Sequence, residues 1–238
     1  VTMTLEQLVT QLRAAHGDAL LAVVLYGSAA RGERAGPRSD RNVLVVIREF
    51  VSERLGPAGA VSRSWREGGN PDLLTLTAAE WTSSVDVFAI EHADIVDRHR
   101  VLYAAPGFAV GARAAVRHED IRRQLEYESL ALLLRVRAAT GDAGADVRAM
   151  RALLAAHGSA ALALFRAALR LSGAPVGDDT AVYAAVAEAA GFSAEPFAAA
   201  VAQRRGTEEV PKDKLPAVVE AFHAGLMAFV EYVDRLSE

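Results

Sequence analysis

A short stretch near the N-terminus combines residue types that could hold a phosphate group and a metal ion. Gly27 and Ser28 follow the apolar run Ala22–Tyr26, and Asp40 and Asn42 open a second apolar run. Glycine lets the chain turn sharply and come close to a ligand, and a helix starting at the serine could point its amides at a phosphate. Side chains alternate along a strand, so Asp40 and Asn42 are expected on one face. The stretch therefore predicts a phosphate cradle beside a pair of metal ligands.

This pattern resembles the nucleotidyltransferase superfamily of the DNA polymerase β type. Members carry a hydrophobic strand, Gly-Ser, a spacer, and then Asp-x-Asp or Asp-x-Glu on the next strand. Gly27, Ser28 and Asp40 match, with Ser39 before the acid, whereas Asn42 stands where the superfamily has its second acid. The resemblance implies transfer of a nucleoside monophosphate from a nucleoside triphosphate, such as ATP, to a hydroxyl group of a small-molecule acceptor.

The resemblance also implies a metal cofactor, Mg²⁺ or Mn²⁺. Two such ions neutralise the phosphates and activate the acceptor oxygen, and Mg²⁺ takes hard oxygen ligands. We expect Asp40, Asn42 and Asp94 to be the metal ligands. The nucleotide-binding residues are then Gly27, Ser28 and the basic loop residues Arg31 and Arg38, with Arg34 as a further candidate.

A third carboxylate is needed to complete the catalytic set. The segment 86–103 looks like the third motif region of small bacterial members, and it contains Glu91 and Asp94, with Asp86 before them. We expect the catalytic residues to be Asp40 with Glu91 and Asp94. The alternative is that the last two acids form surface salt bridges with nearby arginines, which would stabilise the fold little.

Asn42 leaves three interpretations open. An amide oxygen can bind Mg²⁺ but carries no charge, so the second ion should bind less tightly. The chain is then an enzyme with a weaker metal site, a pseudoenzyme that binds nucleotide without turning it over, or a protein-interaction module like the antitoxin half of a toxin–antitoxin pair.

Composition limits the other classes of function. The chain has 238 residues, 52% of them hydrophobic, and no cysteine, which excludes disulfides and thiolate metal sites. Its net charge of -4 argues against a broad nucleic-acid-binding surface. We expect a cytoplasmic bacterial protein without a signal peptide or a membrane span, because no apolar run reaches about 18 residues. Its partners would be a nucleoside triphosphate and a small-molecule acceptor.

The pattern of elements predicts an α+β fold with a boundary near residue 110. Residues 1–110 would form a nucleotidyltransferase-like α/β core with a mixed sheet. Thr4 and Thr77 each precede a polar residue three positions on, which predicts capped helices. Strands are expected at 22–26, 43–47, 73–76, 85–91 and 100–103.

Residues 111–238 would form an all-α helical bundle. Helices are expected at 116–139, 145–171, 180–190, 194–204 and 214–236. This order resembles small bacterial nucleotidyltransferases, including aminoglycoside nucleotidyltransferases in outline, in which the bundle helps to bind the acceptor. The alanine-rich helices could also pack across a homodimer.

Several conspicuous side chains are expected to have structural roles. Trp65 and Trp81 would pack in the core. Arg166 and Arg170 lie one helical turn apart, and we expect them on a solvated face rather than against an anionic ligand. His92 would be exposed or paired.

Overall fold

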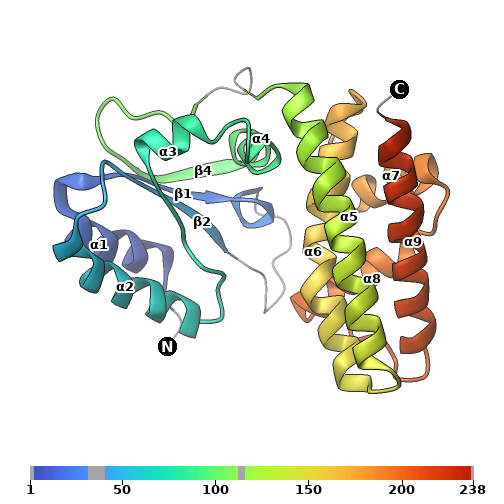
Figure 1. Ribbon diagram of the computed structural model, residues 1–238. Coiled ribbons are helices and arrows are strands. Elements are labelled where there is room, and N and C mark those ends of the chain that lie inside the picture. The colour runs from blue at the N-terminus through green and yellow to red at the C-terminus, as the bar shows by residue number, and fades with distance from the viewer. Residues whose placement is uncertain (1–2, 32–40, 112–115, 237–238) are drawn as a thin grey trace. The chain divides into compact units, whose positions relative to one another are not determined.

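The structure is a computed structural model that describes residues 3–31, 41–111 and 116–236. The chain divides into two compact units, Val1–Val116 and Arg117–Glu238 (Figure 1). The first unit contains a sheet with helices, and the second contains helices alone. The expected α+β fold with a helical C-terminal part is therefore confirmed.

The first unit alternates helices and strands around a four-stranded sheet. Its elements are α1 (Leu5–His16), a 3₁₀ turn (Gly17–Ala19), β1 (Leu20–Tyr26), a second 3₁₀ turn (Ser28–Arg31), β2 (Asn42–Ile47), α2 (Ser52–Glu67), β3 (Leu74–Thr77), α3 (Ala78–Ser83), α4 (Ala89–Asp97) and β4 (His99–Ala104). The strand order is β3-β2-β1-β4. β1 is antiparallel to β2 and β4, whereas β2 is parallel to β3. The sheet is mixed, as expected, and its first two strands are neighbours.

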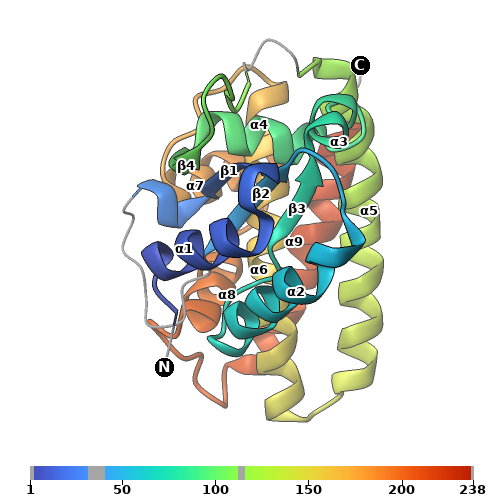
Figure 2. The same ribbon diagram turned by 90° about the vertical axis from the view of Figure 1, so that its left-hand side faces the viewer.

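Each face of this sheet is covered by its own pair of helices. Alternate residues of β1 and β2, such as Val23 and Val45, face α1 and α2 and pack with Trp65. The residues between them, such as Val24 and Leu44, pack on the opposite face with Trp81 of α3 and with Ile95 of α4. Figures 1 and 2 show the sheet between these two pairs of helices. Burial on both faces explains why both strands read as continuous apolar runs.

Both predicted helix caps are confirmed. The Thr4 hydroxyl accepts from the amide of Gln7 at 3.2 Å, and the Gln7 side chain accepts from the Thr4 amide at 2.8 Å. Thr77 and Glu80 make the same reciprocal pair at the start of α3. These local hydrogen bonds fix where α1 and α3 begin.

The strand expected at 85–91 is wrong. Residues 84–88 form turns, and α4 begins at Ala89. Ala89, Ile90 and Ala93 are buried on one side of this helix, a spacing that a helix produces and a strand does not. The helix brings Glu91 and Asp94, three positions apart, to neighbouring places on its surface.

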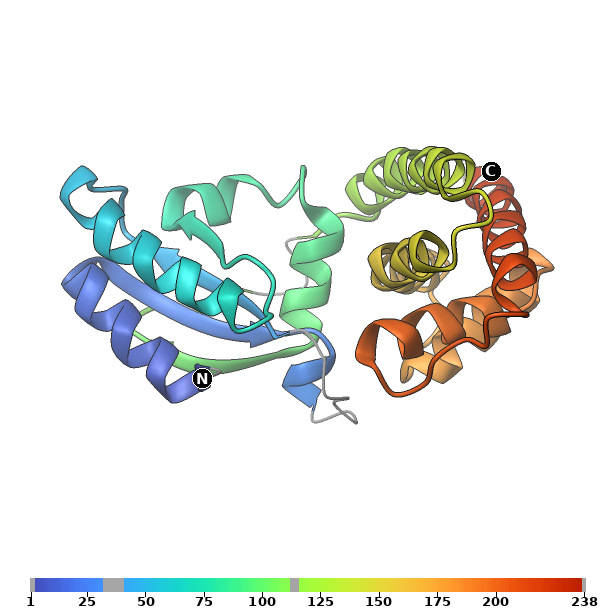
Figure 3. The same ribbon diagram turned by 90° about the horizontal axis from the view of Figure 1, so that it is seen from below.

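The second unit is a bundle of helices. They are α5 (His118–Ala143), α6 (Val147–Leu171), α7 (Asp179–Ala190), α8 (Glu195–Arg205) and α9 (Leu215–Arg235). α6 packs against each of the other helices, and it lies among them when the bundle is seen along its axis (Figure 3). Phe165 of α6 contacts the rings of Phe197 and Phe229, with centroids 4.9 and 4.6 Å apart. α6 is therefore the core helix of the bundle.

Two helices, α6 and α9, are long and apolar enough to cross a membrane, by length and composition alone. This differs from the expectation that no segment would reach that limit. In α6, 61% of the most apolar stretch of 18 residues is buried inside the protein, and in α9 33% of that stretch is buried. α6 is apolar because it is the core helix, and one or two helices of this kind are weak evidence for a membrane span.

The expectation that Arg166 and Arg170 lie on a solvated face is wrong. Both side chains are buried. Arg166 of α6 forms an ion pair with Asp179 at the start of α7, and Arg205 of α8 binds the other oxygen of that carboxylate at 2.6 Å. The carboxylate therefore joins three helices through charge-assisted hydrogen bonds.

Candidate nucleotide site

The end of β1 supplies the turn that the sequence pattern predicts. Gly27 has a φ of +76°, a conformation that favours glycine. Its amide donates to the carbonyl of Arg98 at 3.1 Å, and its carbonyl accepts from the amide of Ala30 at 3.2 Å. The Gly27 amide is therefore occupied, so backbone donors for a phosphate would come from residues after it.

Asn42 lies beside this turn. It is the first residue of β2 and pairs in register with Tyr26 of β1. A β-carbon at Gly27 would be 3.4 Å from the Asn42 Nδ2 atom, so the amide packs against the glycine. Because side chains alternate along β2, Asn42 shares the α3–α4 face of the sheet with Leu44. The structure therefore brings together Gly27 and Asn42, two of the residues that the sequence indicated.

Tyr26, the last residue of β1, packs near α4, the helix that carries Glu91 and Asp94. Its ring packs against the cluster that includes Ile95 of α4. Burial, together with the negative charges of Glu91 and Asp94, raises the pKa of the Tyr26 phenol to about 12. Both acids lie on α4, which packs against the Tyr26 cluster through Ile95 and ends beside the Gly27 turn, where the Arg98 carbonyl accepts from the Gly27 amide. Sequence reasoning treated Tyr26 only as a strand residue, because its relation to α4 is visible only in the folded sheet.

Packing on its buried side holds α4 in place. The His92 ring stacks on Trp81 of α3, with centroids 3.8 Å apart, and its Nε2 atom is 3.3 Å from the Ser84 hydroxyl. Burial lowers the pKa of His92 to about 4, so the imidazole is neutral at pH 7. His92 is thus paired, as expected, and it is buried. Its stack fixes the helix that carries Glu91 and Asp94.

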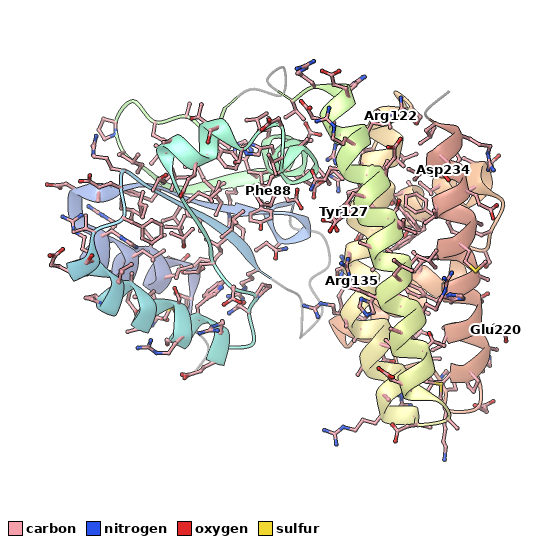
Figure 4. All side chains as sticks on the ribbon, in the orientation of Figure 1. Phe88, Arg122, Tyr127, Arg135, Glu220 and Asp234 are labelled. Carbon is pink, nitrogen blue, oxygen red and sulfur yellow. The ribbon has the colours of Figure 1, made fainter. Side chains whose placement is uncertain are left out.

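Other predicted site residues are placed differently or not described. Asp86 is exposed in the turn before α4 (Phe88 in the same turn is labelled in Figure 4), whereas Glu91 and Asp94 are half-buried on the helix itself. Arg34, Arg38 and Asp40 lie outside the described residues. Ser28 and Arg31 belong to the second 3₁₀ turn, but their side chains are also outside what the structure describes. Their predicted roles stay predictions.

No complete set of metal ligands is found among the residues that the structure describes. Asn42, Glu91 and Asp94 offer hard oxygen atoms of the type that Mg²⁺ binds. Within residues 3–31, 41–111 and 116–236, however, there is no group of three His, Asp or Glu side chains that could hold a metal ion.

A separate cavity of about 350 Å³ lies between α3, α4 and the chain after β4. Its walls are mostly apolar and include Trp81, Val85, His92, Phe108 and Val110, and among the described residues no Asp, Glu, Lys or Arg lines it. Phosphate groups need charged or amide donors. We therefore do not place the triphosphate in this cavity.

No protein-family model and no curated protein matches the sequence. Among solved structures, the fold is similar to that of the spectinomycin adenyltransferase AAD(9) from Enterococcus faecialis, determined with ATP and spectinomycin. The TM-score is 0.59 and the sequence identity 14%, over 99% of this chain and 100% of that chain. At this identity the similarity shows the fold alone: the chain shares the fold of that structure, helical C-terminal part included.

Proposed function

We propose that this protein is a nucleotidyltransferase that moves a nucleoside monophosphate from a nucleoside triphosphate to a hydroxyl of a small molecule. The observation that carries the proposal is the meeting of the Gly27 turn, Asn42 and the two α4 acids at one end of β1. The shared fold supports it, because the similar adenyltransferase was determined with ATP and spectinomycin.

In this proposal the residues after Gly27 bind the triphosphate. Since the Gly27 amide is already bonded to Arg98, the donors would be the backbone and hydroxyl of Ser28. Arg31 and Arg38 would add charge-assisted hydrogen bonds to phosphate oxygens, for which the guanidinium group is well suited.

The predicted metal ligands and the acids of α4 would act on the acceptor hydroxyl. Asp40, Asn42 and Asp94 would hold a divalent cation, which when bound neutralises phosphate charge and polarises the acceptor hydroxyl. Glu91 or Asp94 would take the proton that this hydroxyl loses, because general bases must lie within reach of the reacting oxygen. Packing of α4 through His92 and Trp81 would keep both carboxylates in position.

Asn42 favours a second candidate function. Residue 42 is an asparagine where the superfamily pattern has an acid, so the site offers less negative charge to two bound cations. The protein would then bind nucleotide without efficient transfer, as a pseudoenzyme or as an antitoxin-like interaction module.

The binding test is a thermal-shift panel of ATP, GTP, CTP and UTP with Mg²⁺, Mn²⁺ or EDTA. A ligand that binds only the folded state adds RT ln(1 + [L]/Kd), about 2.7 kcal/mol at a hundredfold excess over Kd. We expect one nucleotide to stabilise the protein in the presence of metal, and Asp40→Ala to remove that response. Asp72→Ala, at an exposed carboxylate of the same unit, is the control and should keep it. No stabilisation by any nucleotide would refute the proposed site.

Pyrophosphate release separates the two candidate functions. The bound nucleotide is offered with spectinomycin and with other polyhydroxylated small molecules as acceptors. Release that depends on an acceptor and on Asp40 supports the transferase. Nucleotide binding without release across the acceptor panel supports the pseudoenzyme instead.

A further inference from the structure

An apolar stripe runs along the outer face of α5. Tyr127, Leu130 and Leu134 have exposed fractions of 72%, 48% and 50%. Their spacing of three and four residues places them on one side of a helix, and Ala131 and Ala138 fall on the same side. The opposite side is the core side of this helix; its buried residues include Leu125, Leu132 and Val136. α5 is thus apolar on two opposite faces.

The apolar outer face of α5 is unusual for a helix at the surface of a bundle. A helix at the edge of a bundle normally has one apolar face toward the core and a polar face toward water. Continuous exposed apolar surface marks a site of interaction. Figure 4 shows Tyr127 and Arg135 along α5, one residue of the stripe and one charged residue that flanks it.

Charges beside the stripe indicate what covers it. Glu126 and Glu128 lie before its middle, and Arg135 and Arg137 lie after it. The pairs 128/135 and 126/137 share one midpoint, between residues 131 and 132. If two α5 helices meet antiparallel about a two-fold axis at that midpoint, Glu128 faces Arg135 of the second copy. Glu126, which binds Arg122 of its own helix at 3.0 Å, then lies on the same flank as Arg137 of that copy, so opposite charges meet on both flanks of the stripe.

The same arrangement matches the apolar residues. Tyr127 and Leu134 lie on opposite sides of the midpoint, and in the antiparallel arrangement Tyr127 would lie between Leu134 and Ala138 of the second helix. Leu130 would lie near the axis, against Leu134 of the second copy. An apolar face flanked by charges that complement themselves is what an isologous contact requires.

We propose that α5 is a self-association surface and that the protein forms an antiparallel homodimer through Tyr127, Leu130 and Leu134. The flanking acids and arginines set the orientation. The proposal is independent of the nucleotide site.

Sedimentation equilibrium of the full chain tests it first. We expect a mass twice the 25.3 kDa of one chain, with a dissociation constant at least tenfold weaker for Leu130→Ser/Leu134→Ser. Leu55→Ser removes a similarly exposed leucine, 50% exposed on α2, and should leave the dimer unchanged. A wild-type chain that remains monomeric up to high concentration, or equal weakening by both variants, would overturn the proposal.

Charge reversal tests the antiparallel orientation. Glu128 and Arg135 also form a loose pair within one helix, 3.7 Å apart, so a single reversal alters intrachain and interchain contacts together. Glu128→Arg and Arg135→Glu should each weaken self-association at least tenfold, because like charges then meet across the axis. When the two variants are mixed, opposite charges meet again, and we expect a heterodimer. Mixing cannot repair an intrachain defect, so failure of the mixture to associate would overturn the arrangement.

Discussion

The side-chain amide of Asn42 packs against Gly27, with its Nδ2 atom 3.4 Å from the position that a β-carbon at residue 27 would take. The contact joins the first residue of β2 to the turn that ends β1. One substitution at each position tests the turn conformation and the charge at residue 42, each with a measurable result.

Gly27→Ala should destabilise the protein by about 1–2 kcal/mol, because a β-carbon disfavours the φ of +76°. We expect it to weaken nucleotide binding as well, since the turn after β1 would shift. Gly69→Ala is the control: Gly69 has a φ of +84° with nothing within 4 Å of its β-carbon position. Urea unfolding should show similar losses for both variants, and only Gly27→Ala should reduce the nucleotide-induced thermal shift. Equal nucleotide responses would mean that the Gly27 turn does not touch the ligand.

Asn42→Asp should strengthen metal-dependent nucleotide binding about tenfold, which corresponds to about 1.4 kcal/mol. The added charge attracts a nearby cation by a few kcal/mol at an effective dielectric constant of about 20, and desolvation removes part of that gain. The measurement is a Mg²⁺ titration with a nonhydrolysable triphosphate present. Asn70→Asp, at the other asparagine of the chain, should leave the titration unchanged. If Asn42→Asp instead slows a fast wild-type pyrophosphate release, Asn42 is an adapted ligand.

Asp179→Asn should cost about 3–5 kcal/mol of unfolding free energy, because it removes the carboxylate charge that the buried Arg166 guanidinium binds. Arg205 loses the same carboxylate. The exposed pair of Arg66 and Asp72 offers the comparison: Asp72→Asn should cost no more than about 1 kcal/mol. Chemical denaturation of the two variants checks the difference, and a small loss for Asp179→Asn would show that the buried pair contributes little.

His92→Phe should make stability less sensitive to acid. The folded-state pKa of His92 is about 4, below the ordinary 6.5, so the unfolded chain binds a proton first as the pH falls. Its contribution is therefore full above pH 6.5 and declines toward pH 4, by about 2 kcal/mol between about pH 7.5 and about pH 5. Phenylalanine keeps a ring to stack on Trp81 and cannot titrate. Unfolding curves at several pH values compare the wild type with this variant and with His118→Phe, an exposed control whose pH dependence should match the wild type.

Local sequence signals predicted much of the fold. The capping pairs at Thr4 and Thr77 fixed helix starts because their hydrogen bonds span only three residues. The apolar runs of β1 and β2 predicted neighbouring strands because both faces of the sheet are buried. At 85–91 a short alternation of apolar residues predicted a strand. The segment instead turns and begins α4, because Ile90 and Ala93 are buried on one side of a helix.

Long-range contacts could not be predicted in the same way. Arg166 is buried because Asp179 of another helix neutralises it, and nothing in the spacing of the two residues indicates that pair. Glu91 and Asp94 were expected at the site from resemblance alone. Their nearness to Tyr26 depends on how α4 packs over the sheet, whereas the role expected of Asp40 stays a prediction.

The order of the strands has a consequence for the rate of folding. Val23 of β1 pairs with Val45 but also with Tyr103 at the far end of the unit, whereas α5 and α6 pack together across a short connection. Contacts between distant parts of a chain form slowly. Both tryptophans, Trp65 and Trp81, belong to the sheet-containing unit, so their fluorescence reports that unit alone. In stopped-flow refolding, we expect the circular dichroism of the helical unit to recover before the tryptophan signal does.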